Sequence, residues 1–218
     1  VMTSYDLDFH RKLDNMADYS GLSDHELLGL MTKGNQLAFE CLFDRYTSAV
    51  FKFCYSILLD HQSAEDATQD VFVKVWHKGN LWQPGDATFK TWVLTLARHH
   101  CFDVLRKLKS ENKKHQGFFQ NLFSFGSSHQ EMNSVEKSLD QVQYSDQIKD
   151  IIFTLPERQR EAVTLVYYMD IQNVEAAGIM NIKPAAFDSL LARARRELKK
   201  KVANAKELQA RGLNYETK

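Results

Sequence analysis

An acidic segment is the first part of the sequence whose residue types suggest a use. Residues 53–73 contain no lysine or arginine. Within them, the stretch SAEDATQDVF (63–72) has apolar residues at helical spacing, so one face of a helix is expected to be buried. That face would consist of Ala64, Ala67, Thr68, Val71, Phe72, Val75 and Trp76. The side chains left facing outward would be Glu65, Asp66, Gln69, Asp70 and Val73.

The outward acids have two explanations. Ser63 is expected to cap the helix, which places Glu65 and Asp66 in the first turn, where carboxylates stabilise the positive end of the helix dipole. Asp70 lies one turn further along, so the helix end explains it less well. The alternative is a surface that binds a partner of opposite charge.

Two basic segments lie far from each other in the sequence. Arg98 to Lys114 holds six lysines and arginines against two acids, and Arg193 to Lys201 holds six against Glu197. A basic run alone is often only a solvated helix face. Two such runs in a chain whose formal net charge is zero favour a polyanion as partner.

The first basic segment belongs to a helix expected from Thr88 to Leu108. At 100° per residue, one arc holds Phe89, Trp92, Val93, Leu96, Ala97, His100 and Val104. The opposite arc holds Thr91, Thr95, Arg98, His99, Phe102 and Arg106. Phe102 is either a stacking platform for unpaired bases or, as we favour, a side chain covered by a neighbouring helix. His99, His100 and Cys101 point about 100° apart and do not form a metal site.

The remaining pattern predicts an all-α protein with two small helical domains joined by a linker. Few glycines and prolines interrupt the chain, and Ser23 with Glu26 forms a capping box. We expect a flexible extension over 1–21, a first domain over 22–110, a linker over 111–142, a second domain over 143–203 and a tail over 204–218. The first domain would hold a short helix from Ser23, a long one after Gly34-Asn35, the acidic helix and the basic helix.

The second domain carries the pattern of a helix-turn-helix. Asn173 is expected to cap a helix over 174–180, Asn181 to adopt the left-handed conformation, and Pro184 to begin the next helix. Phe187, Leu190, Leu191, Ala194 and Leu198 would form its buried face. The outward residues would be Ala185, Asp188, Ser189, Ala192, Arg193 and Arg196. In such motifs the start of the second helix enters the major groove.

Other functional classes find little support. The three cysteines are scattered, so no disulfide framework or zinc site is expected, and we predict no metal and no cofactor. No nucleophile-base grouping or phosphate-binding loop is present, which disfavours an enzyme. No apolar run reaches about 18 residues, so we expect no membrane insertion and a cytoplasmic location.

Three stretches, in order, resemble one family. AEDATQDVFVKVW is similar to the segment with which group-IV (extracytoplasmic-function, ECF) sigma factors dock on the β′ clamp helices of bacterial RNA polymerase. FKTWVLTLARHHCFDVLRKLKSE resembles the helix that melts and reads the minus-ten element. TLPERQREAVTLVYYMDIQNVEAAGIMNIKPAAFDSLLARARREL resembles the domain that reads the minus-thirty-five element. The resemblance implies an alternative sigma factor with core RNA polymerase (β′ clamp helices and β flap), promoter DNA and an anti-sigma factor as partners.

The resemblance also implies site residues. Core polymerase would be bound by Glu65, Asp66, Gln69 and Asp70, with Phe72 supporting them from within. The loop from Lys78 to Gly85 would capture a flipped base, with Asn80 and Gln83 for its edge and Trp82 either stacking on it or capping the core. Minus-ten DNA would be bound by Lys78, Asn80, Trp82, Gln83, Lys90, Arg98, His99, Arg106, Lys107 and Lys109.

The chain departs from the family pattern in the second domain. Lys183 replaces the usual capping serine or threonine, and Asp188 with Leu190 replaces common basic residues, so recognition is expected to rely on DNA shape and backbone. Minus-thirty-five DNA would be bound by Lys183, Ala185, Asp188, Ser189, Arg193, Arg195 and Arg196. A helix-turn-helix regulator that binds an operator is the alternative function, and a helical adaptor without a nucleic-acid role is a third.

Overall fold

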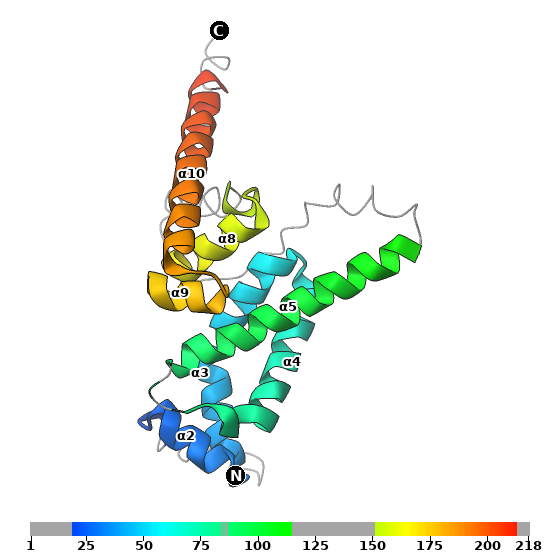
Figure 1. The fold of residues 1–218 in the computed structure, drawn as a ribbon, viewed down its shortest axis with the longest axis vertical. Helices are drawn as coiled ribbons and strands as arrows, with labels where there is room; N and C mark the ends of the chain where they lie inside the picture. The colour runs from blue at the N-terminus through cyan, green and yellow to red at the C-terminus, as the bar shows by residue number, and fades with distance from the viewer. Residues whose placement is uncertain (1–18, 84, 86, 115–150, 213–218) are drawn as a thin grey trace, which may run out of the picture.

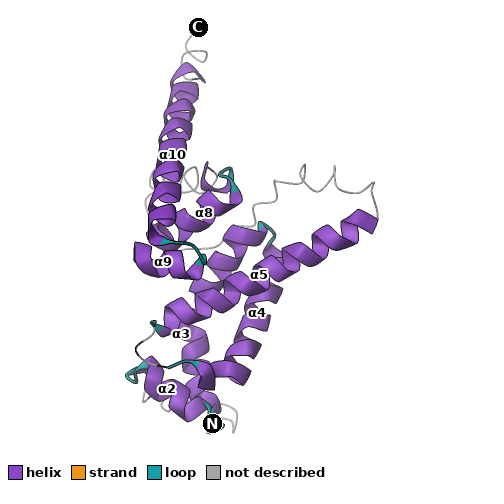
Figure 2. Cartoon of the chain, in the orientation of Figure 1, coloured by secondary structure: helices purple, strands orange, loops and turns teal. Residues whose placement is uncertain are grey.

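The computed structural model describes residues 19–83, 85, 87–114 and 151–212, and all regular structure in these ranges is helical (Figures 1 and 2). The N-terminal unit contains α2 (Asp24–Met31), α3 (Gln36–Leu58), α4 (His61–Lys78), the short turn η1 (Gly79–Leu81) and α5 (Phe89–Lys114). The C-terminal unit contains α8 (Glu157–Val163), the π-helical η2 (Thr164–Tyr168), α9 (Asn173–Ile179) and α10 (Pro184–Gly212). The predicted all-α class is confirmed.

The first helices begin where the sequence predicts. Ser23 caps α2, and its backbone N–H donates to Glu26 Oε2 at 2.8 Å, which completes the capping box. Gly34 has a φ of 87°, which suits glycine, and Asn35 then caps α3 by accepting from the amide of Ala38. These local interactions place α2 and the 23-residue α3.

The start predicted for the acidic helix is wrong. Asp60, not Ser63, is the N-cap of α4, and its carboxylate accepts from the amide of Ser63 at 2.8 Å. Hydrogen bonds from the Ser63 side chain and then from its amide lower the pKa of Asp60. The first turn of α4 contains no acidic residue, so the helix dipole does not account for Glu65 and Asp66.

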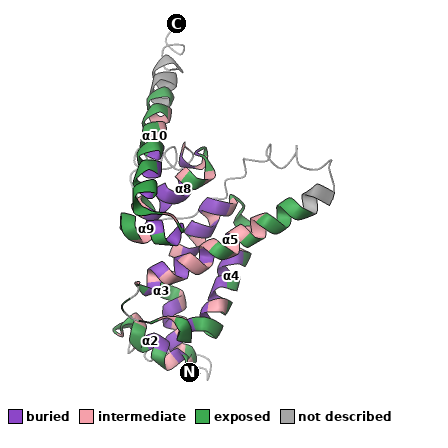
Figure 3. Ribbon diagram, in the orientation of Figure 1, coloured by how far each residue is buried: buried purple, intermediate pink, exposed green. Residues whose placement is uncertain are grey.

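Helix α3 is the centre of the N-terminal unit and packs against α2, α4 and α5. The buried faces of these helices turn toward one another, and the exposed faces turn outward (Figure 3). Phe53, Leu42, Phe72 and Phe89 are among the largest fully buried side chains. Of the predicted buried face of α4, Trp76 is the exception, because its side chain remains 39% exposed.

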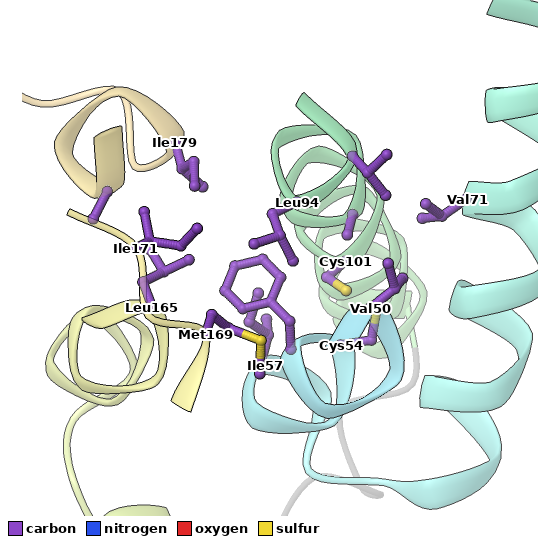
Figure 4. Close-up of a cluster of buried hydrophobic side chains, with 14 of the residues drawn as sticks. Val50, Cys54, Ile57, Val71, Leu94, Cys101, Leu165, Met169, Ile171 and Ile179 are labelled. Carbon is purple, nitrogen blue, oxygen red and sulfur yellow. The ribbon is translucent and has the colours of Figure 1, made fainter. Parts of the chain in front are cut away.

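The two units share one hydrophobic cluster. Ile57 of α3 and Leu94 of α5 lie beside Leu165, Met169 and Ile171 of the C-terminal unit (Figure 4). Helix α5 also contacts α9, and α3 contacts α8. In this structure the second unit therefore packs on the first through buried apolar side chains.

A buried arginine adds a polar connection at the same place. Arg160 of α8 is 6% exposed, and its Nε donates to the carbonyl of Ser56 at 2.5 Å. Its Nη1 donates to the carbonyls of Phe153 at 3.2 Å and Leu155 at 3.0 Å. Ser56 lies in the last turn of α3, where helix carbonyls lack an intrahelical partner, so α8 caps α3.

The helix-turn-helix has the predicted turn with one correction. Asn181 adopts the left-handed conformation with a φ of 51°, and Pro184 begins α10. Asn173 is not the cap of α9, because the N-cap is Gln172, without a side-chain bond, and Asn173 is already helical. Helix α10 continues to Gly212, past the end expected for the second domain at 203.

The predicted linker lies largely outside the described residues. Helix α5 runs to Lys114 and so extends past the expected boundary at 110. The rest of the linker over 115–142 and the extension over 1–18 are not described. The described part of the second domain begins at residue 151, and residues 151–153 are helical.

Gly79 is a point where an added methyl group would displace the buried side chains of α2. A Cβ there would lie 2.4 Å from Met31 Cε and 3.0 Å from Leu28 Cδ2. We therefore expect Gly79→Ala to lower the free energy of unfolding by about 1 kcal/mol through overpacking. Gly29→Ala is the control, because Gly29 lies within α2 with open space around it. It should stabilise the protein by about 0.5–1 kcal/mol. Urea denaturation measures both, and equal effects would contradict the packing at Gly79.

Candidate core-binding and nucleic-acid interfaces

The outward face of α4 is acidic as predicted. Asp66, Gln69 and Asp70 are exposed, and Phe72 lies beneath them, 2% exposed. Two local interactions order this surface: Gln62 Nε2 donates to Asp66 Oδ1 at 3.1 Å, and His61 Nδ1 lies 3.5 Å from Glu65 Oε1. The structure thus brings the sequence-predicted acids together on one helix face.

An apolar rim continues this face toward the end of α4. Val73 is 55% and Trp76 39% exposed. Trp76 packs edge-on against Phe39 of α3, with ring centroids 5.2 Å apart. The prediction that Trp76 is a core residue is wrong, because its environment is set by Phe39 on a neighbouring helix, which periodicity within α4 does not specify. The surface therefore combines carboxylates with exposed apolar groups.

Asp70 belongs to a polar cluster that links α4 to α5. His100 of α5 lies with Nε2 3.2 Å from Asp70 Oδ2 and with Nδ1 2.6 Å from Lys74 Nζ. Burial, followed by the charge of Lys74, lowers the pKa of His100. The neutral imidazole accepts from Lys74 at Nδ1 and donates to Asp70 from Nε2. The acidic surface is therefore held in place by the basic helix behind it.

Two of the predicted minus-ten residues on α5 form bonds with the C-terminal unit. Arg98 forms an ion pair with Glu161 of α8, and Lys90 Nζ donates to the carbonyl of Met169. Arg98 also lies over the ring of Phe102, 4.5 Å from its centroid. Phe102 is half-buried, in keeping with the covered alternative.

The remaining basic residues of α5 lie toward its C-terminal end. His99, Arg106, Lys107 and Lys109 are exposed. Arg106 Nη1 lies 3.2 Å from Asp103 Oδ1, a surface pair that contributes little to stability. These side chains are exposed along the C-terminal half of the helix, with the acidic Asp103 among them.

In the loop before α5 the amide side chains are exposed and the tryptophan packs against the protein. Lys78, Asn80 and Gln83 are exposed, whereas Trp82 is half-buried. The indole Nε1 of Trp82 donates to the carbonyl of Ala87 at 3.2 Å, and its ring packs edge-on at 5.9 Å from Phe89. Of the two alternatives for Trp82, this packing favours the core.

The helix-turn-helix presents its predicted residues to solvent. Lys183, Ala185, Asp188, Ser189, Arg193, Arg195 and Arg196 are all exposed. Asn173 Nδ2 donates to Asp188 Oδ1 at 2.8 Å, which binds the acid to α9. Arg195 Nε donates to Tyr167 Oη at 2.5 Å and so lies against η2. A hollow of about 400 Å³ beside α10 is lined by Gln159, Arg193, Arg196, Glu197 and Lys200.

The described residues contain no group of three His, Cys, Asp or Glu side chains that could hold a metal ion. Cys41, Cys54 and Cys101 are free and buried. Burial raises the pKa of Cys41, and a hydrogen bond with Cys54 together with burial raises that of Cys101. Within the same ranges, no helix has the length and apolar character needed to cross a membrane.

The low pKa of His100 predicts a specific pH dependence of stability. When the pH falls below about 6.5, the ordinary pKa of histidine, His100 is protonated in the unfolded chain but less so in the folded protein. The free energy of unfolding should therefore fall as the pH drops from 7.5 to 5.5. The fall should be smaller in His100→Asn, measured by urea denaturation at both pH values. An equal fall in both proteins would show that His100 does not contribute.

Comparison with known proteins identifies both units. A sigma-70 region 2 family model matches residues 42–111, and a sigma-70 region 4 model matches residues 145–198. The chain is 30% identical over 158 residues to the ECF RNA polymerase sigma factor SigM of Bacillus subtilis, which covers 72% of this chain and 91% of that protein. It is 28% identical over 143 residues to the ECF sigma factor RpoE of Cereibacter sphaeroides, which covers 66% and 74% of the two chains.

Two solved structures have the same fold. The sigma factor RpoE of Bartonella quintana, solved in complex with the anti-sigma factor NepR, matches with a TM-score of 0.63 and 25% identity over 76% of this chain and 96% of that one. CnrH, solved with the cytosolic domain of CnrY, matches with a TM-score of 0.57 and 20% identity over 83% and 97%. With the identity to SigM, these matches show that the chain belongs to the ECF family of RNA polymerase sigma factors and is an alternative sigma factor, a transcription initiation factor.

Proposed function

We propose that the chain docks α4 on core RNA polymerase, presents α5 and the preceding loop to minus-ten DNA, and presents α9 and α10 to minus-thirty-five DNA. The observation that carries this proposal is the exposed acidic face of α4, with Asp66, Gln69 and Asp70, beside the basic helix α5. The protein acts in the cytoplasm by binding and has no catalytic role of its own. The first domain would span 22–110 and the second 143–203.

Core binding is supported by charge and by apolar surface. Asp66 is exposed, lies beyond the first turn of α4 and accepts a hydrogen bond from the neutral Gln62, so its negative charge is accessible to a basic partner helix. Val73 and Trp76 add apolar area next to it. Complementary charge steers the partners together, and the burial of apolar groups contributes to affinity.

DNA binding is supported by the exposed basic and amide side chains. Lys78, Asn80 and Gln83 project from the loop, and Arg106, Lys107 and Lys109 follow along α5. Amides can discriminate base edges, whereas lysines and arginines position the phosphate backbone. We infer that Asn80 and Gln83 contribute sequence recognition, and that Trp82 supports the loop from within.

Minus-thirty-five binding would depend mainly on the phosphate backbone. The start of α10 offers Ala185 and Ser189, while Asp188 is held by Asn173. Ser189 Oγ donates to the carbonyl of Ala185 at 2.9 Å, which leaves few free donors for base edges. Arg193 and Arg196 are exposed one to two turns later. This distribution favours recognition through shape and charge.

An anti-sigma factor is the proposed regulator. The similar RpoE structure contains a bound anti-sigma factor, and its fold extends over both units of this chain. We propose that a protein of the same class binds this chain and prevents its access to core polymerase.

The docking proposal predicts that Asp66→Arg weakens binding to core RNA polymerase at least about tenfold, equivalent to about 1.4 kcal/mol, because it places like charges together at the interface. Asp44→Arg is the matched control, since Asp44 is an exposed acid on α3. Titration of labelled protein with core enzyme, without DNA, measures both affinities. Parent-like affinity of Asp66→Arg would refute the placement, and failure of the parent to bind core would favour an operator-binding regulator.

The backbone-contact proposal predicts that Arg193→Ala with Arg196→Ala lowers affinity for duplexes with different minus-thirty-five sequences to a similar extent. The slope of log affinity against log salt should flatten by about 0.9 for each lost phosphate contact. Lys33→Ala with Lys52→Ala removes the same charge from exposed positions of the N-terminal unit and should leave the slope unchanged. A loss confined to one base substitution would show instead that these arginines read sequence.

A further inference from the structure

The C-terminal unit covers part of the helix that the proposed function assigns to minus-ten DNA. Glu161 of α8 is 0% exposed and forms its ion pair with Arg98, whose side chain is 13% exposed. Met169 provides the carbonyl that accepts from Lys90. Thr91 Oγ1 lies 3.4 Å from Glu175 Oε1 of α9. Three positions of α5, spread over two turns, therefore face polar groups of the second unit.

These contacts use the chemistry that a phosphate would use. A guanidinium donates to carboxylate and phosphate oxygens with the same N–H groups, and an ammonium group donates equally to a carbonyl or a phosphate oxygen. The C-terminal unit leaves only 13% of the Arg98 side chain exposed, and Lys90 is half-buried, so a phosphate reaches these donors only when that unit moves away. The arrangement seen here therefore opposes DNA binding at these two residues.

The burial of apolar side chains stabilises the contact between the two units, while the ion pair between Arg98 and Glu161 fixes the position of α8 relative to α5. Leu94 is 1% exposed and faces Leu165 and Met169 (Figure 4). By contrast, Glu161 Oε2 is buried without a hydrogen bond from the described residues. Burial also raises the pKa of Glu161, and Arg98 offsets part of this effect. A buried pair of this kind contributes little net stability but makes a mismatched charge costly.

We propose that the carboxylate of Glu161 and the carbonyl of Met169 act as an intramolecular competitor of promoter DNA, which occupies Arg98 and Lys90 until the C-terminal unit moves away from α5. This inference rests on the proposed role of Lys90 and Arg98 in binding minus-ten DNA. It makes the free chain self-inhibited through its own second unit, without an additional protein.

The first experiment places a like charge opposite Arg98 in the full-length chain. Spectroscopic labels at the exposed Lys52 of α3 and Lys199 of α10 report the distance between the units. Glu161→Lys should lengthen this distance. Glu157→Lys makes the same change of charge four residues earlier on α8 and should leave the distance as in the parent.

The same variants test competition with DNA. The probe is a single-stranded oligonucleotide of mixed sequence, because phosphate contacts do not depend on sequence. Glu161→Lys should bind it more tightly than Glu157→Lys does, and the slope of log affinity against log salt should steepen by about 0.7 for each phosphate contact that becomes available. The comparison between the two variants removes the direct effect of the added charge.

Exchanging the two charges distinguishes loss of the ion pair between Arg98 and Glu161 from misfolding of the variants. Arg98→Glu alone should lengthen the distance between the units, and its combination with Glu161→Arg should restore the parent distance. An unchanged distance in Glu161→Lys, failure of the swap to restore it, or equal oligonucleotide binding by the two lysine variants would overturn the inference.

The proposed function has its own test. In the holoenzyme, where core polymerase is already bound, Arg98→Ala should reduce the rate of promoter opening. If it does not, the role of Arg98 in DNA binding is wrong, even where Glu161→Lys separates the units. If it does, and the units of Glu161→Lys remain together, only the intramolecular competition is wrong.

Discussion

Helix α5 has more apolar surface than one neighbouring layer can cover, and this constraint organises the molecule. Val93 and Ala97 are fully buried, and Leu94 on the adjacent face is 1% exposed. Helices α3 and α4 cover one side of α5, and α9 covers another. A helix that is apolar on more than one face must be buried on more than one face. The position of the C-terminal unit follows from this requirement.

The same helix connects the functional surfaces. His100 joins α5 to the acidic face of α4 through Asp70, and Arg98 joins it to α8 through Glu161. Two side chains, two positions apart on one helix, thus contact the element proposed to bind polymerase and the element proposed to displace DNA. A shift of α5 would therefore change its contacts with both α4 and α8.

Local rules predicted the helices, because caps and turns involve residues close in sequence. Ser23, Asn181 and Pro184 have the expected roles, and Gly34-Asn35 forms the expected break before α3. The start of α4 was missed because Asp60 and Ser63 are both good capping residues and only geometry selects between them.

Features that depend on distant residues were not predictable in this way. In the sequence, Glu161 looks like an ordinary helical acid and Trp76 like a core residue. Their environments are set by Arg98, 63 positions away, and by Phe39 on another helix. Helical periodicity specifies the direction of a side chain within its helix and says nothing about which partner lies there.

The capping of α3 by Arg160 has a consequence for how the protein unfolds. When α8 separates from α3, the carbonyl of Ser56 loses the hydrogen bond that Arg160 donates to it, and the buried guanidinium becomes solvated. The last turn of α3 would then fray, and water would reach Ile57 in the shared cluster. The stability of the last turn of α3 is thereby coupled to the packing of the sequence-distant α8.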